Sequence, residues 1–197
     1  TDLFNRTHTI TELENACARA ANGTIDQTLL LVEPDNFRSV LDNIGIGNAD
    51  LLLGDIASLL RKVIGEGDIA GRVGDHLFAL LLGKRDADAT SKFAQRLQAA
   101  FAEHIFEVGK RSINLTASIG GVLLGEKNAR ADTLMADAAT ALRQVQTEGG
   151  NRVHIHDPSA QDKAAAEATK RWVGLIDHAL ANDGFVLYHQ PIISLHG

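Results

Sequence analysis

Apolar residues recur along the chain at two spacings, which separate expected helices from expected strands. Residues three and four positions apart, such as Ile10, Leu13 and Cys17, give a helix one apolar face. Short, continuous apolar runs are typical of strands buried on both faces. These patterns predict helices over 9–21, 36–43, 48–64, 88–105 and 134–146, and strands over 28–32, 111–124 and 152–156.

Apolar runs also flank Gly74 and Asp75, which predicts a β-hairpin within residues 68–83. Glycine at the first central position of a tight turn reaches positive φ without a steric penalty, so Gly74 is expected there. Pro34 is expected to end the first strand, because proline cannot donate a hydrogen bond to a sheet. Gly120 and Gly121 are expected to bend the strand over 111–124. Because strands alternate with helices, we predict an α/β sandwich with a central sheet.

Composition excludes several classes of protein. The net charge of −6 gives no basic face for nucleic acid, so a nucleic-acid partner is not expected. No apolar run approaches the roughly 20 residues that a membrane span requires. The single cysteine, Cys17, cannot form an internal disulfide and fits a reducing compartment. We therefore expect a cytoplasmic protein without a membrane span.

The C-terminal part of the chain differs in composition from the rest. Ala, Glu, Lys and Asp dominate from Pro158 to Arg171, which favours a helix that buries little surface. An apolar strand is expected within 185–195, with nothing in this sequence to pair with it. We therefore expect one domain over 1–157, a linker helix over 158–183, and the first strand of a truncated second domain over 184–197.

Several short motifs occur in a fixed order between residues 3 and 153, and together they resemble those of a GGDEF domain. The resemblance implies a ferredoxin-like α/β (α+β) domain of the nucleotidyl-cyclase and polymerase-palm type, with helices flanking a central sheet. The motifs are Asn5-Arg6, Asp35-x-Phe37-Arg38, Gly45, Asp50-x-x-Leu53-x-x-x-Ala57, Arg72, Phe78, Thr116-Ala-Ser-Ile-Gly120 and Gly149-x-Asn151-Arg152.

In active GGDEF domains, two cations assist the joining of two GTP molecules into cyclic di-GMP. By resemblance, the first metal-binding Asp of the family falls on Glu33, and the metal-binding Glu of its signature falls on Leu77, which cannot bind a metal. The second glycine of the signature falls on Asp75. The signature here is therefore expected to be degenerate, with a vestigial Glu33, no catalytic residue, no metal and no cofactor; it comprises Gly74, Asp75, His76, Leu77 and Phe78.

The nucleotide contacts implied by the resemblance are only partly present. The Asn that bonds guanine falls on Leu41, whereas its partner is retained as Asp50. Two phosphate-binding Lys residues fall on Arg38 and Gln146. Asp50 and Arg38 are therefore candidates for residual nucleotide binding, although Asp50 is equally well explained by the favourable field at a helix N-terminus.

Two further alternatives concern residues of the same region. His76 could act as a base or metal ligand, but with no carboxylate at Leu77 a solvated turn histidine is favoured. Asp35 could simply cap the helix that begins near Asn36. The inhibitory product site of the family falls on Gly65 and Asp68, so product is not expected to dock there.

The final residues resemble the first strand of an EAL domain, a family that binds or hydrolyses cyclic di-GMP. Gln190 matches a ligand-contacting Gln of that family. The combination resembles FimX-type regulators of type IV pili and twitching motility. It implies an inactive regulatory GGDEF domain coupled to an EAL domain; the alternative is a GTP-sensing module that activates an EAL phosphodiesterase. The implied partners are the EAL domain, an upstream sensory domain, cyclic di-GMP through the EAL part, a PilZ-type protein and a second copy in a homodimer, with the cell pole as a candidate location.

Overall fold

The computed structural model describes residues 3–23, 27–83 and 86–181. The chain divides into two units, Thr1–Pro158 and Ser159–Gly197. The second unit contains one described helix, α6 (Ala160–Ala181). The elements of the first unit are α1 (Arg6–Ala21), β1 (Gln27–Pro34), α2 (Phe37–Ile44), η1 (Ile46–Asn48), α3 (Ala49–Val63), β2 (Ile69–Arg72), β3 (Phe78–Gly83), α4 (Ala87–Glu103), β4 (Ile105–Val108), β5 (Arg111–Asn114), β6 (Ala117–Leu123), η2 (Glu126–Asn128), α5 (Ala131–Thr147) and β7 (Val153–His156).

The first unit is built on a mixed five-stranded sheet in the order β2-β3-β1-β6-β7. β1 pairs antiparallel with both β3 and β6, and β7 lies parallel to β6 at one edge. Val32, near the end of β1, lies opposite Phe78 of β3 and Ile119 of β6. This register brings the tip of the β2–β3 hairpin beside Glu33. The predicted α/β fold with a central sheet flanked by helices is confirmed.

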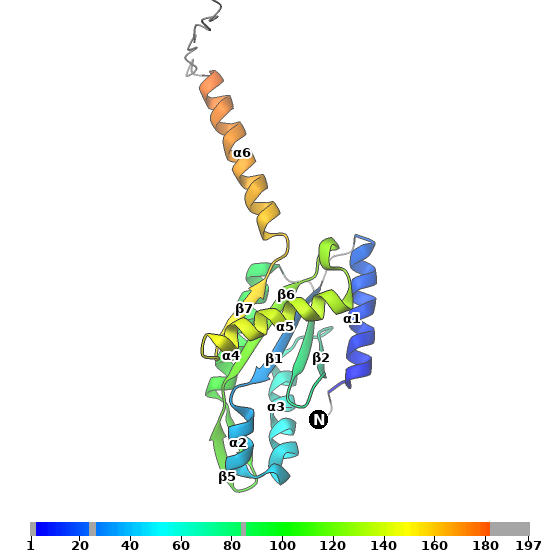
Figure 1. Cartoon of the computed structure of the whole chain (residues 1–197), viewed down its shortest axis with the longest axis vertical. Coiled ribbons are helices and arrows are strands. Elements are labelled where there is room, and N and C mark those ends of the chain that lie inside the picture. The colour runs from blue at the N-terminus through cyan, green and yellow to red at the C-terminus, as the bar shows by residue number, and fades with distance from the viewer. Residues whose placement is uncertain (1–2, 24–26, 84–85, 182–197) are drawn as a thin grey trace, which may run out of the picture. The chain divides into compact units, whose positions relative to one another are not determined.

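Helices cover both faces of the sheet (Figure 1). The side chains of β1 alternate between the two faces, as expected for a strand. Leu30 and Val32 pack in one apolar cluster with side chains of α2, α3 and α4. Leu29 and Leu31 pack in a second cluster with side chains of α1 and α5. β1 is therefore the central strand of a core on each side.

The segment that follows α4 differs from the prediction. Residues 111–124 do not form one strand, because β5 pairs with β4 in a separate two-stranded sheet and only β6 joins the main sheet. Gly120 and Gly121, which were predicted to mark a bend, both lie within the paired part of β6. A Cβ atom on Gly120 would lie 2.2 Å from the backbone nitrogen of Leu142 in α5. The glycines are therefore required for close packing.

The end of β1 also differs slightly from the prediction. Pro34 is the last residue of the strand, opposite Ala117 of β6, instead of ending the strand before it. The next residue restores the backbone bonding, because the Asp35 N–H donates to the Thr116 carbonyl at 2.9 Å. Pairing with β6 therefore extends past the proline.

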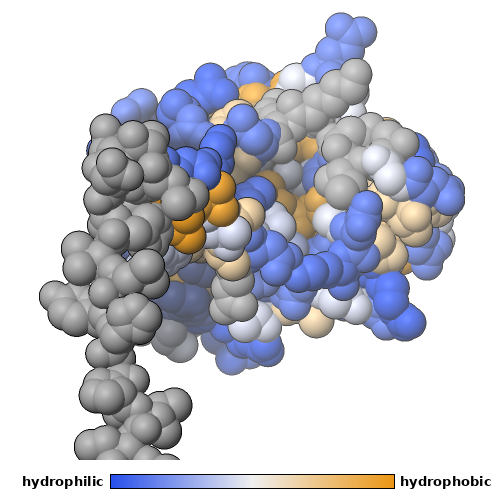
Figure 2. Space-filling view, turned by 90° about the horizontal axis from the view of Figure 1, so that it is seen from above, coloured by the Kyte–Doolittle hydropathy of each residue, from blue (hydrophilic) through white to orange (hydrophobic). Residues whose placement is uncertain are grey.

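The surface of the molecule is mainly hydrophilic on the face shown in Figure 2, where smaller apolar areas lie between polar residues. Within the described ranges, none of the helices combines the length and the hydrophobicity needed to cross a bilayer.

Gly54 lies inside α3, where an added Cβ would meet no atom within 4 Å. Because glycine loses more backbone entropy in a helix than alanine does, Gly54→Ala is expected to raise the free energy of unfolding by about 0.5–1 kcal/mol. Gly45→Ala is the matched control: the space there is equally open, but φ is +86°. That control should lower stability by about 1 kcal/mol. Urea unfolding of both variants measures the difference, and equal effects would contradict the prediction.

Candidate functional site

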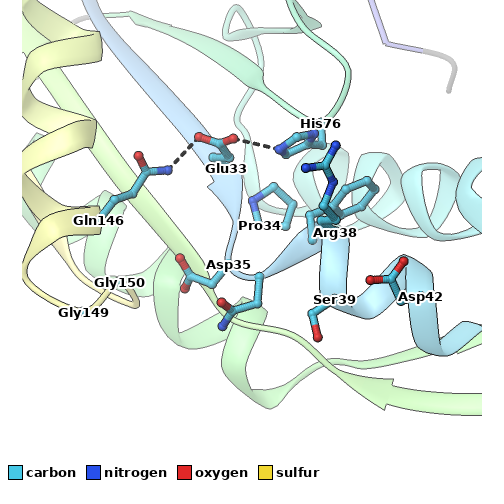
Figure 3. A pocket seen from close by; sticks show the side chains of 12 residues that line it. Glu33, Pro34, Asp35, Arg38, Ser39, Asp42, His76, Gln146, Gly149 and Gly150 are labelled. Atoms are coloured by element: carbon cyan, nitrogen blue, oxygen red, sulfur yellow. Dashed lines mark hydrogen bonds and ion pairs between the residues drawn. The ribbon is translucent and has the colours of Figure 1, made fainter.

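An open cleft of about 770 Å³ lies where the end of β1 meets three other parts of the first unit. These parts are the tip of the β2–β3 hairpin, the first turn of α2 and the end of α5, as Figure 3 shows. The cleft is lined by Glu33, Pro34, Asp35, Asn36, Phe37, Arg38, Ser39, Asp42, His76, Gln146, Gly149 and Gly150.

Glu33 is the centre of a polar network in this cleft. One carboxylate oxygen, Oε1, lies 2.8 Å from Nε2 of His76. The other, Oε2, accepts a hydrogen bond of 2.7 Å from the side-chain amide of Gln146. The two partners approach from opposite sides (Figure 3). Glu33 is thus paired at both oxygens with protein groups.

His76 is fixed in place by a second contact. Its ring stacks on that of Phe37, with centroids 4.7 Å apart and planes inclined by 13°. The side chain is 36% exposed. The prediction of a solvated turn histidine is right about its place in the turn and its partial exposure, but it missed the pairing with Glu33. It considered only the neighbouring Leu77 as a carboxylate position, whereas the actual partner comes from β1 across the sheet register.

The hairpin tip is a five-residue loop, Val73 to Leu77, between the paired residues Arg72 and Phe78. The Leu77 carbonyl accepts from the N–H groups of Val73 at 2.9 Å and Gly74 at 3.2 Å. The Arg72 guanidinium donates to the carbonyls of Gly74 and Asp75. Gly74 does not have a positive φ. The prediction of a tight turn with glycine at its first central position is therefore wrong.

The two residues that follow His76 do not line the cleft. Leu77 is partly buried and packs against the apolar cluster beneath α1. Phe78, the first residue of β3, is fully buried in the cluster on the opposite face of the sheet. Leu77 is not among the residues that line the cleft. Its side chain stabilises the hairpin tip by apolar contact.

Asp35 joins three segments at the floor of the cleft. Its carboxylate accepts hydrogen bonds from the Thr116 hydroxyl at 2.7 Å, the Ser118 hydroxyl at 2.6 Å and the Asn151 N–H at 2.9 Å. A Cβ on Gly150 would lie 2.8 Å from this carboxylate. Asp35 does not cap α2, whose N-cap residue Asn36 adopts the left-handed conformation without a side-chain cap. That alternative is wrong because β6 and the α5–β7 loop engage the carboxylate.

Of the remaining predicted residues, some line the cleft and others lie outside it. Arg38, in the first turn of α2, lines the cleft, whereas Asp50 lies exposed in the first turn of α3 and is not part of the lining. Leu41 packs against the core. Asp68 accepts hydrogen bonds of 2.9 Å from the N–H groups of Gly65 and Gly83, and so links the α3–β2 loop to β3. Gln190 lies outside the described residues.

The charges of the cleft are predominantly negative. Its lining contributes three carboxylates, Glu33, Asp35 and Asp42, and one guanidinium, Arg38, which gives a formal charge of −2 with His76 neutral. In the part of the chain that the structure describes, no cluster of three or more His, Cys, Asp or Glu side chains could hold a metal ion.

Comparison with known proteins identifies the domain. Residues 1–152 match the family model described as "Diguanylate cyclase, GGDEF domain". The chain belongs to the GGDEF family. The GGDEF domain of FimX from Pseudomonas aeruginosa is 31% identical, with a TM-score of 0.74 over 79% of this chain and 96% of that one. The predicted GGDEF domain is therefore confirmed.

Two curated relatives from Pseudomonas aeruginosa match nearly the whole chain. The cyclic di-GMP phosphodiesterase NbdA is 26% identical over 99% of this chain and 24% of that protein. The bifunctional diguanylate cyclase/cyclic di-GMP phosphodiesterase MucR is 26% identical over 97% of this chain and 27% of that protein. The chain thus spans about a quarter of the length of these relatives.

Proposed function

We propose that this chain is a non-catalytic regulatory GGDEF domain of a cyclic di-GMP signalling protein. The observation that carries the proposal is the state of Glu33, whose two oxygens are engaged by His76 and Gln146. Leu77, at the position where the family resemblance places a metal-binding Glu, packs into apolar surroundings. The carboxylates that would hold cations are therefore either engaged or absent.

The electrostatics of the cleft support the same proposal. Phosphoryl transfer depends on positioning and on stabilising negative charge, which bound cations normally supply. Here a triphosphate would enter a cleft whose lining has a formal charge of −2, with Arg38 as its guanidinium. Without cations, repulsion opposes both binding and reaction. Loss of metal assistance of this kind costs several kcal/mol in the transition state.

The wider role that we propose rests on the similar proteins. NbdA and MucR carry cyclic di-GMP phosphodiesterase activity in their names and match the chain through α6. Similarity to the FimX domain covers 79% of this chain. We therefore propose that the domain regulates an EAL domain that follows it, in a FimX-type protein that controls type IV pili.

A second candidate, a GTP-sensing module, is favoured by the cleft itself. Its volume of about 770 Å³ is in the range of ligand sites, and Arg38 is part of its lining. Calorimetry with GTP tests this candidate. Micromolar binding that is lost in both Arg38→Ala and Asp50→Ala would favour it, whereas no heat of binding would exclude it.

Incubation with GTP and Mg²⁺ or Mn²⁺ is expected to yield no cyclic di-GMP above the protein-free blank, because the cleft cannot hold the cations in place. The product is measured by chromatography. The active GGEEF domain from Vibrio cholerae, 25% identical to this chain, serves as the positive control. Time-dependent product formation by this chain would overturn the proposed function.

A further inference from the structure

We propose that His76 and Gln146 take the place of a divalent cation at Glu33, so that His76 competes directly with any metal ion for this carboxylate. This inference deepens the proposed function and rests on it. It also predicts that a metal ligand added nearby would bind a cation more weakly while His76 is present.

The first step of the argument is the geometry at Glu33. A carboxylate that binds a cation must direct at least one oxygen to it, and an oxygen that already accepts a short hydrogen bond is less available. Both oxygens of Glu33 are so engaged, at 2.8 Å by His76 and at 2.7 Å by Gln146. Each oxygen has a further lone pair, so a cation could share an oxygen with its donor, but only with a weakened bond unless the donor moves aside.

The second step is that His76 is held in its position. Stacking on Phe37 leaves the imidazole edge facing Glu33, so the pairing does not depend on a freely rotating side chain. The loop that carries His76 is itself closed by the Arg72 guanidinium and by bonds to the Leu77 carbonyl. The donor is therefore pre-organised, which reduces the entropy lost in forming the bond.

The third step concerns what the pairing connects. Glu33 is the last residue but one of β1, His76 lies on the β2–β3 tip, Phe37 begins α2 and Gln146 lies in the last turn of α5. A bound cation in such a cleft would join ligands from several elements. The Glu33 network makes the same connections with protein groups only. Gln146 is the more exposed of the two donors, so His76 is expected to contribute more.

Mn²⁺ affinity, measured by electron paramagnetic resonance without nucleotide, tests the proposal. Leu77 packs against an apolar cluster, so the charged side chain of Leu77→Glu is expected to turn out of that cluster at the hairpin tip. Leu77→Glu/His76→Ala also releases Glu33. The double variant is expected to bind Mn²⁺ about 10-fold more tightly than Leu77→Glu, a factor at the low end for a charge-assisted hydrogen bond. Leu77→Glu/His156→Ala is the matched control, because His156 is exposed on β7 and does not line the cleft.

Equal Mn²⁺ affinity of Leu77→Glu with and without His76 would overturn the proposal. If Leu77→Glu does not fold, His76→Ala is compared with the unmodified chain by Mn²⁺-induced broadening of the amide resonances near Glu33. Stronger broadening in His76→Ala supports the proposal, and equal broadening overturns it. Neither readout involves GTP, so failure here is distinct from failure of the proposed function, which is cyclic di-GMP formation by the unmodified chain.

Discussion

Asp35→Ala is expected to lower the free energy of unfolding by about 3 kcal/mol, because three hydrogen bonds to one carboxylate are lost together. The Ser118 hydroxyl is fully buried and would lose its acceptor. An unsatisfied buried hydroxyl costs about 1–3 kcal/mol. The Asn151 N–H lies nearer solvent and is expected to contribute less. Urea unfolding followed by circular dichroism measures the change.

Two matched variants separate this role from a general effect of charge. Asp42→Ala removes an exposed carboxylate from the same cleft and should change stability by less than about 0.5 kcal/mol. Asp35→Asn keeps the shape but loses the charge and one acceptor position, so an intermediate loss is expected. If Asp35→Ala and Asp42→Ala had equal effects, the linking role assigned to Asp35 would be wrong.

The fold could be predicted because periodicity reports burial directly. The apolar stripe of α3 and the continuous run of β1 are encoded within single elements, and both were located to within a few residues. The β4–β5 hairpin was missed because its pairing is local but weakly patterned: Arg111 to Asn114 has only one side chain that is not exposed. A short strand with few apolar residues shows little of the apolar–polar alternation by which strands are predicted.

The candidate site was less predictable, because its contacts join residues far apart in the chain. Glu33 and Gln146 are separated by 113 positions, and no motif links them. The pairing of Glu33 with His76 follows from the register of Val32 opposite Phe78, which sequence patterns alone do not specify. The family resemblance drew attention to Glu33 and Gln146, but it assigned their roles from the residues that the family has at those positions. The contacts that these side chains make with one another became visible only in the structure.

The same reason explains why the close packing at Gly120 and Gly121 was not predicted. A glycine in a strand indicates either a bend or the close approach of another group, and the sequence does not distinguish the two. Gly120 lies beneath α5, where an added Cβ would meet Leu142 N at 2.2 Å and Ala138 O at 2.7 Å. The neighbour that excludes a side chain is therefore more than fifteen residues away along the chain.

Gly120→Ala is expected to destabilise the domain by about 3 kcal/mol or more, at the upper end of the overpacking range. The atoms in the way are the backbone of α5, so relief requires moving a helix that packs on both β1 and β6. Gly121→Ala should cost less, because its Cβ would meet the terminal carbons of Leu30 and Ile155, at 2.4 and 2.5 Å, which can rotate away. Thermal and urea unfolding rank the two variants.

Gly83→Ala completes this series as the matched control. Gly83 also belongs to a strand of the main sheet, as the last residue of β3, but an added Cβ would meet nothing within 4 Å. Its substitution should change the free energy of unfolding by less than about 1 kcal/mol, because only backbone entropy is altered. The expected order of destabilisation is therefore Gly120→Ala, then Gly121→Ala, then Gly83→Ala. If Gly120→Ala were as stable as Gly83→Ala, α5 could not pack as closely on β6 as the structure places it.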